Sequence, residues 1–219
     1  MFVQDCIDTS LPFIRLTDDA GYALELMQEY KAPALTVVNE GVFVGIVSEN
    51  QLLEVDDRCL IENLQENLIT DSITEGTHLF DVVKKTTESS SYYMPVINAE
   101  KEYMGITTPQ KILSTLAMYS SFMSGGGIIV LELETKDYSL TEISKIVESN
   151  GAMILHCMVA TSTNQHQMQV SLKVNKNDLK DIQLAFERYH NTVLAVLHQS
   201  EYEMQLKDRY DSLMRYLEV

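Results

Sequence analysis

The sequence predicts an α+β protein with two similar β-α-β-β-α units, then a βαββαβ unit and a C-terminal amphipathic helix. Three observations support this fold class. A strand-turn-strand pattern recurs about sixty residues along the chain, a glycine run at residues 125–127 interrupts it, and apolar residues after that run alternate between strand and helix spacing. A chain of 219 residues is long enough for one large or two small domains.

The repeated pattern is a pair of strands joined by a short turn. Residues 35–39 and 41–46 form the first pair, residues 94–98 and 102–106 form the second, and the closing glycines of the pairs are 60 residues apart. The apolar runs have the length of strands, and the Asn-centred breaks between them suit hairpins. The recurrence predicts two copies of one unit.

Helices are expected on both sides of each strand pair. Before the pairs, apolar residues follow cap-like polar residues at helical spacing: Ala20, Ala23, Leu24 and Met27, and later Leu79, Val82 and Val83. After the pairs, residues 48–53 and 108–113 each resemble a helix start, and Pro109 suits a first turn. We therefore assign residues 1–60 to the first repeat and residues 61–119 to the second.

The pattern changes at residues 120–127, which are rich in Ser and Gly. We interpret them as a linker, because consecutive glycines carry a large entropy cost inside a helix or strand. Residues 128–199 form the next unit. Its expected elements are strand 128–134, helix 140–149, strands 153–161 and 167–174, helix 178–189 and strand 192–198. The order βαββαβ is that of a ferredoxin-like unit.

The last stretch, residues 200–219, places Leu206, Tyr210, Leu213 and Leu217 at steps of four, three and four. This spacing predicts an amphipathic helix with an apolar stripe. The stripe suits a contact with a partner or a second copy, and equally a position folded back on its own domain, because so short a helix is unstable alone in water.

Composition excludes several partners. The chain has 32 acidic and 16 basic residues, a net charge of −16, whereas nucleic-acid binding requires a basic surface. No apolar stretch approaches the roughly 18 residues of a spanning helix. We therefore expect neither nucleic acid nor membrane as a partner. The first residues carry no positive charge followed by an apolar run, so no secretion signal is indicated and a cytoplasmic location is expected.

Catalytic and metal-binding motifs are missing from the sequence. There is no Gly-x-Ser-x-Gly, no phosphate-binding glycine loop followed by Lys, no His-Glu-x-x-His and no calcium loop. Cys6, Cys59 and Cys157 are far apart and have no His at ligand spacing, so neither a disulfide framework nor a metal site is expected. We predict a protein that is not an enzyme and holds no resident cofactor.

The repeated strand pair with its glycine resembles a tandem pair of CBS (cystathionine β-synthase) domains. The family has a Pro-Val-Val-Asp-like strand followed by Gly-Ile-Val, a pattern met at residues 94–98 with 105–107. It is met less fully at residues 35–39 with 45–47, where Thr36 replaces the proline. The downstream unit is similar to an ACT domain, and the order CBS-CBS-ACT resembles the acetoin-utilisation accessory proteins of bacteria.

The resemblance implies a regulatory homodimer with an unidentified protein target. In the family, adenine nucleotides or related adenosyl compounds lie in clefts between the repeats, so AMP, ATP or an S-adenosylmethionine-type ligand is implied. A Ser or Thr followed three residues later by Asp holds phosphate and ribose at the start of the last helix. The candidate ligand-binding residues carried over are Thr36, Ser48, Gln51, Met94, Pro95, Thr108 and Lys111.

Two positions depart from the family pattern. Ser48 and Thr108 match the hydroxyl, but Gln51 and Lys111 stand where the family has Asp. An amide accepts ribose hydroxyls less strongly than a carboxylate, and an ammonium accepts none. Lys111 suits either a direct phosphate contact or a solvated position on its helix.

Charge also bears on the ligand. Residues 1–125 hold 7 basic and 19 acidic residues, a net charge of −12, which disfavours polyphosphate. We expect weak binding of AMP or an adenosine-like ligand in preference to ATP. The alternative is a dimeric scaffold that has lost ligand binding; a third hypothesis, a cryptic enzyme or hydrolase activator, has no motif in its favour.

The ACT-like unit has its own candidate residues. In amino-acid-binding members, the first strand leads into an Asp and then a Gly at a helix start. Asp137 and Leu140 match this pattern, and Ser139 occupies the glycine position. Ser139 suits either a helix cap or a ligand contact. Pairing of sheet edges between two copies is an equally good role for this unit.

Overall fold

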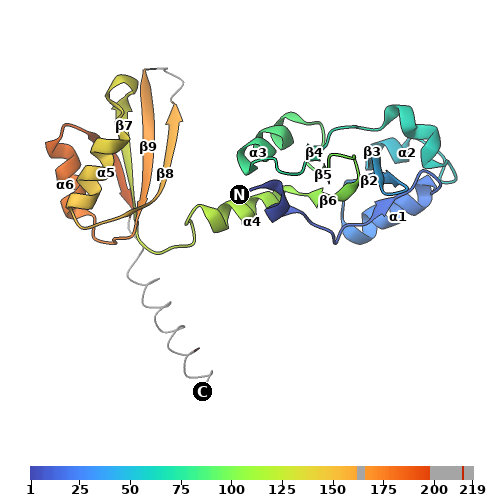
Figure 1. The fold of residues 1–219 in the computed structure, drawn as a ribbon, viewed down its shortest axis with the longest axis horizontal. Coiled ribbons are helices and arrows are strands. Elements are labelled where there is room, and N and C mark those ends of the chain that lie inside the picture. The colour runs from blue at the N-terminus through green and yellow to red at the C-terminus, as the bar shows by residue number, and fades with distance from the viewer. Residues whose placement is uncertain (162–165, 198–213, 215–219) are drawn as a thin grey trace. The chain divides into compact units, whose positions relative to one another are not determined.

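A computed structural model describes residues 1–161, 166–197 and 214. The chain divides into two compact units, Met1–Tyr119 and Ser120–Val219. The first contains two three-stranded sheets and the second a four-stranded sheet, each with its own helices (Figure 1). The predicted α+β class is confirmed.

The first unit repeats one order of elements. The first copy comprises β1 (Phe13–Ile14), α1 (Ala20–Tyr30), β2 (Ala34–Asn39), β3 (Val42–Ser48) and α2 (Glu49–Leu53). The second comprises β4 (Ile73–Thr74), α3 (Leu79–Glu88), β5 (Met94–Ile97), β6 (Tyr103–Thr107) and α4 (Pro109–Tyr119). In each copy the first strand is parallel to the second, and the second is antiparallel to the third. The predicted β-α-β-β-α order is confirmed in both copies.

Short segments before each copy are exchanged between the copies. The 3-10 helix η1 (Val3–Cys6) precedes the first copy, but its buried residues belong to the core of the second. The 3-10 helix η2 (Ile61–Asn67) precedes the second copy, but its buried residues belong to the core of the first. We call residues 3–8 the N-terminal arm and residues 61–69 the central arm. A boundary at residue 60 therefore separates the repeats in the sequence but not the two packed halves.

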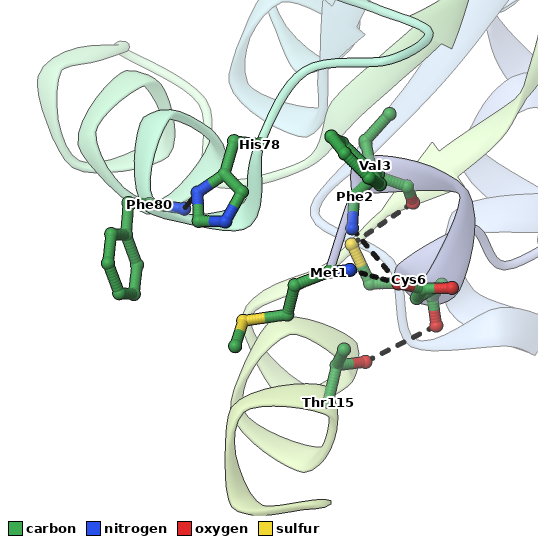
Figure 2. Close-up of polar contacts among 8 residues, drawn as sticks. Met1, Phe2, Val3, Cys6, His78, Phe80 and Thr115 are labelled. Carbon is green, nitrogen blue, oxygen red and sulfur yellow. Dashed lines mark hydrogen bonds and ion pairs between the residues drawn. The ribbon is translucent and has the colours of Figure 1, made fainter. Parts of the chain in front are cut away.

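The N-terminal arm is held by backbone and side-chain contacts with the second copy. Figure 2 shows the ring of Phe2 meeting His78 edge to face, with ring centroids 5.9 Å apart. The Thr115 hydroxyl of α4 donates to the backbone carbonyl of Asp5 at 3.4 Å. These contacts attach the start of the chain to α3 and α4.

Each arm ends in a backbone bridge to the third strand of the opposite copy. Asp8 pairs with Ile106 of β6, and Ile69 pairs with Ile46 of β3. The repeated glycine beside each bridge allows this approach. A Cβ at Gly45 would lie 2.6 Å from the Leu68 Cβ, and a Cβ at Gly105 would lie 2.5 Å from the Ile7 Cγ2.

The second unit has the predicted βαββαβ order. It comprises β7 (Gly127–Glu134), the 3-10 helix η3 (Thr135–Asp137), α5 (Leu140–Ser149), β8 (Ile154–Thr161), β9 (Gln167–Val174), α6 (Lys180–Arg188) and β10 (Thr192–Leu197). The sheet is antiparallel, with strand order β10-β7-β9-β8. Helices α5 and α6 pack on one face of it (Figure 1) and share its core.

The boundaries expected from the sequence can be compared with the structure at the first end of the second unit but not at the last. β7 begins at Gly127, one residue before the expected strand, because Gly127 pairs with Val174 of β9. The preceding Gly126 has a φ of +115° and lies directly against the Val174 carbonyl, where no Cβ fits. The helix expected over residues 200–219 falls outside the described residues, apart from Met214. None of the described helices is both long and apolar enough to cross a bilayer.

Candidate functional site

A cleft of about 450 Å³ lies between the two copies of the first unit. Residues 9–13, which follow the N-terminal arm, and Tyr30 at the end of α1 form one side. Residues 103–105 of β6 form the other side. We call it the aromatic cleft, because three of its side chains are Phe13, Tyr30 and Tyr103.

The aromatic side chains give this cleft its chemical character. The rings of Phe13 and Tyr103 meet edge to face, with centroids 5.8 Å apart and an interplanar angle of 69°. Phe13 and Tyr30 are 44% and 43% exposed, so each offers ring surface to a ligand. Rings of this kind bind flat, partly apolar groups by stacking. The hydroxyls of Thr9 and Ser10 add polar partners at the same cleft.

Thr36, a predicted ligand residue, does not line the cleft but pairs with the lining residue Phe13 on the neighbouring strand. Its hydroxyl is buried and makes no well-formed hydrogen bond among the described residues, yet it is near enough to the Tyr103 phenol to affect it. Burial raises the pKa of Tyr103, the Thr36 hydroxyl lowers it, and the Asp8 carboxylate raises it further. Tyr103 therefore stays a neutral hydroxyl at physiological pH.

Thr108 and Lys111 lie at the start of α4, next to the N-terminal arm. The Thr108 hydroxyl accepts a hydrogen bond from the Lys111 amide at 3.3 Å. Asp8 of the arm accepts from the Ser10 amide at 2.8 Å and from the Ser10 hydroxyl at 2.6 Å. These bonds lower the pKa of Asp8, and the charge of Lys111 lowers it further. Thr108 and Lys111, which the sequence places together as candidate ligand residues, are thus next to the segment that leads into the cleft.

Ser48 and Gln51 occupy the corresponding place at the start of α2. The Gln51 Oε1 accepts from the amide and the hydroxyl of Ser48, both at 2.9 Å, and the Ser48 hydroxyl accepts from the Gln51 amide at 3.4 Å. The Gln51 Nε2 donates to the Asn67 carbonyl at 2.7 Å. These two residues therefore form a capping box and bind the central arm, while their contact with a ligand stays a prediction.

Met94 and Pro95 lie on β5 and do not line the aromatic cleft. Met94 contributes to a smaller cavity of about 270 Å³, whose other lining residues are polar or charged. In this cavity the Ser89 hydroxyl donates to the Asp71 carboxylate at 2.6 Å. Pro95 is buried and pairs with Ile106 of β6. The residues expected to form one ligand site are thus distributed over both halves of the unit.

The second unit places its three candidate residues at the start of α5. Asp137 ends η3 and lines an acidic cavity of about 420 Å³ with Glu132, Glu134 and Glu142. Ser139 caps α5 by accepting from the Glu142 amide at 3.3 Å. Leu140 is 48% exposed. An effector role for these residues remains a prediction.

Sequence reasoning missed Phe13, Tyr30 and Tyr103. They come from three elements far apart in the chain, and none belongs to a motif with recognisable spacing. An aromatic residue within an apolar pattern looks like a core residue, so only the packed structure distinguishes ring surface that lines a cleft.

Comparison with known proteins finds a family similarity in the first copy. The sequence profile of the CBS domain matches residues 3–58. A CBS domain pair/ACT domain protein of Thermotoga maritima aligns with 19% identity over 54% of this chain and 98% of its own, with a TM-score of 0.49. The CBS domains of a Streptococcus pneumoniae transcriptional regulator align with 18% identity over 52% and 98%, with a TM-score of 0.47.

A third similar structure is CBSX2 of Arabidopsis thaliana in complex with AMP, with 24% identity over 53% of this chain and 96% of its own and a TM-score of 0.45. No match was found among curated protein sequences. None of these matches bears on acetoin utilisation. The profile match covers residues 3–58 in the first copy, and the second copy has the same order of elements.

Proposed function

We propose that the first unit is a non-catalytic regulatory sensor whose aromatic cleft binds an adenosyl ligand. The cleft carries this proposal, because it joins three aromatic side chains and two hydroxyls between the copies of the unit. An adenine ring suits the aromatic surface, and the hydroxyls of Thr9 and Ser10 suit the polar edges of adenine or ribose. The CBS match at residues 3–58 supports the same ligand class.

Charge favours AMP or an adenosine-like ligand over ATP. No Lys or Arg is among the described residues that line the aromatic cleft. Residues 1–125 carry a net charge of −12, from 7 basic and 19 acidic residues. A polyphosphate entering such a surface is repelled unless a metal ion neutralises it. The charge of Lys111 lowers the pKa of Asp8, the residue directly before the cleft segment 9–13.

For the second unit we propose effector binding or dimerisation. Asp137 beside an acidic cavity supports the first role, and a ferredoxin-like sheet with exposed edges supports the second. The whole protein would then be a homodimer acting on a protein target. Its relation to acetoin utilisation stays a prediction from the order of the three domains.

A dimeric scaffold without a ligand is the competing proposal. The observation in its favour is that Ser48 and Gln51 hydrogen-bond to each other and to Asn67. Side chains engaged in this way are not preorganised to receive ribose and phosphate. This observation concerns α2, whereas the aromatic cleft lies beside the N-terminal arm.

A thermal-shift panel distinguishes the two proposals. The probes are adenosine, AMP, S-adenosylmethionine, ATP without magnesium and single amino acids. A ligand that binds only the folded state at a hundred times its Kd stabilises the protein by about 2.7 kcal/mol. We expect adenosine or AMP to raise the melting temperature more than ATP does. Micromolar or tighter ATP affinity without magnesium contradicts this preference, and a stable dimer that responds to no probe favours the scaffold.

A pair of tyrosine variants tests the location of the site. Tyr103→Ala removes a ring that lines the cleft, so we expect the AMP-induced shift to be lost. Tyr103→Phe keeps the ring and should retain most of the shift. Tyr92→Ala is the matched control, because Tyr92 is 61% exposed and does not line the cleft. Equal loss in both alanine variants would place the ligand elsewhere.

A further inference from the structure

The two arms join the opposite copies in equivalent ways. η1 ends at Cys6 two residues before the Asp8 bridge, and η2 ends at Asn67 two residues before the Ile69 bridge. The strands that receive these bridges, β6 and β3, lead directly into α4 and α2. The third residue after Thr108, at the start of α4, is Lys111, and the third residue after Ser48, at the start of α2, is Gln51.

We call each place where an arm meets the opposite copy a joint, and we call a joint closed when a further bond links the end of the arm's 3-10 helix to the start of the following helix. At the central arm, a side chain of the protein provides this bond. The Gln51 Oε1 accepts from Ser48, which fixes the amide in the capping box. The Gln51 Nε2 then donates to the Asn67 carbonyl at 2.7 Å. One side chain therefore links the start of α2 to the last residue of η2.

The joint at the N-terminal arm has no equivalent of the Gln51 link, and its side-chain bond from α4 is instead the 3.4 Å bond from the Thr115 hydroxyl to the Asp5 carbonyl. Lys111 occupies the position equivalent to Gln51, and an ammonium cannot accept from the Thr108 hydroxyl or amide. Among the described residues, the Lys111 ammonium makes no recorded hydrogen bond or ion pair. The carbonyl equivalent to that of Asn67 belongs to Cys6, which receives no side-chain bond from α4 in the described structure.

The aromatic cleft lies at the joint that lacks the link. Residues 9–13 follow Asp8 directly, and residues 103–105 directly precede its partner Ile106. A ligand in the cleft therefore contacts both sides of the bridge that the N-terminal arm makes with β6. Among the described residues, none that lines the polar cavity containing Met94 is aromatic.

We propose that the two joints have different roles: Gln51 closes the central joint permanently, and a ligand in the aromatic cleft closes the N-terminal joint. The protein then binds one adenosyl ligand per chain, and binding tightens the attachment of the N-terminal arm to β6 and α4. This inference rests on the proposed sensor function, and the difference between the joints is measurable without a ligand.

Hydrogen exchange of two amides tests the difference in the free protein. The Ile69 amide donates to the Ile46 carbonyl at 3.0 Å, and the Asp8 amide donates to the Ile106 carbonyl at 2.6 Å. Although the second bond is shorter, we expect the Asp8 amide to exchange faster by about two- to tenfold, the range that one net hydrogen bond provides. Equal exchange, or slower exchange of Asp8, overturns the proposal.

Two substitutions test the link itself: one removes it from the central joint, and the other adds it to the N-terminal joint. Gln51→Glu keeps the acceptor for Ser48 but has no donor for Asn67, so exchange of the Ile69 amide should accelerate about two- to tenfold while Asp8 is unchanged. Lys111→Gln supplies the missing amide beside Thr108 and should slow exchange of the Asp8 amide. Lys111→Met removes the charge without adding an amide and should leave exchange of Asp8 unchanged. The same slowing in Lys111→Gln and Lys111→Met would overturn the proposed link.

Calorimetry and exchange with adenosine test the ligand's part. We expect one site per chain and slower exchange of the Asp8 amide, with little change at Ile69. In Lys111→Gln the additional protection at Asp8 should be smaller, because the joint is already closed. Two sites per chain, or protection of Ile69 alone, overturns the inference. Absence of binding by adenosine, AMP and S-adenosylmethionine contradicts the sensor function itself, and the free-protein exchange rates still report the two joints separately.

Discussion

Replacing Gly45 with alanine tests how closely the central arm approaches β3. A Cβ at this position would lie 2.6 Å from the Leu68 Cβ and 3.2 Å from the Ile69 carbonyl oxygen. Carbon atoms normally pack about 3.5–4.0 Å apart, so the arm would have to move by about 1 Å. Overpacking of this kind costs about 1–3 kcal/mol. The arm also carries Ile61 and Leu64, which are buried in the first copy, so it has little freedom to move.

The cost converts into a measurable melting shift. For the unit Met1–Tyr119, an unfolding entropy of about 2.1 cal/mol/K per residue gives about 0.25 kcal/mol/K in total. Gly45→Ala should therefore lower the melting temperature, as measured by calorimetry, by about 4–12 °C. Leu68→Gly removes the opposing Cβ and should reduce the effect of Gly45→Ala, whereas Leu68→Ala keeps that Cβ and should not. A decrease in melting temperature of less than about 2 °C for Gly45→Ala would refute the close approach. So would an equal reduction of the Gly45→Ala effect by Leu68→Gly and Leu68→Ala.

Three further predictions concern single residues. Ser139→Ala removes the cap of α5 and should lower the free energy of unfolding of the second unit by about 1 kcal/mol in urea titration, whereas Ser139→Thr should preserve it. Phe186→Ala deletes a fully buried ring and should cost about 3–5 kcal/mol in the same titration; a cost below 1 kcal/mol would contradict its place in the core. Asp8 has a pKa lowered from its ordinary 3.8, chiefly by Ser10, so its contribution to stability is complete above that value and is lost as the pH falls through the lowered folded-state pKa. Asp8→Asn should therefore be less stable than the wild type at pH 7, and the difference should shrink as the pH falls below 3.8; a difference that does not change with pH would exclude the Ser10 bonds as its cause.

Local patterns in the sequence are sufficient to predict the elements. The apolar spacing of residues 20–27 predicts α1, and the Asp19 carboxylate caps that helix by accepting from the Tyr22 amide at 2.8 Å. The apolar run of residues 128–131 has the length of a strand and predicts β7, whose residues are buried at every second position. Such patterns are visible in sequence because a helix or strand repeats its environment every few residues.

The candidate site was less accessible to sequence reasoning. Gln51 is an imperfect match for a ribose-binding Asp in the sequence, whereas in the structure its amide links a cap to the central arm. Tyr103 carries no motif, yet it lines the aromatic cleft with Phe13. Roles of this kind depend on what lies opposite a side chain, and that neighbour is far away in the chain.

The amino-acid sequence thus contains the two copies, the βαββαβ unit and the acidic charge that disfavours polyphosphate, because periodicity, caps and charge are local or additive properties. It does not show that residues 3–8 and 61–69 exchange places between the copies. Both arms are short, mixed segments with a few apolar residues that suit either core, and the choice depends on long-range packing against Gly45 and Gly105. That exchange places the aromatic cleft beside the N-terminal arm, so the location of the proposed site follows from tertiary contacts.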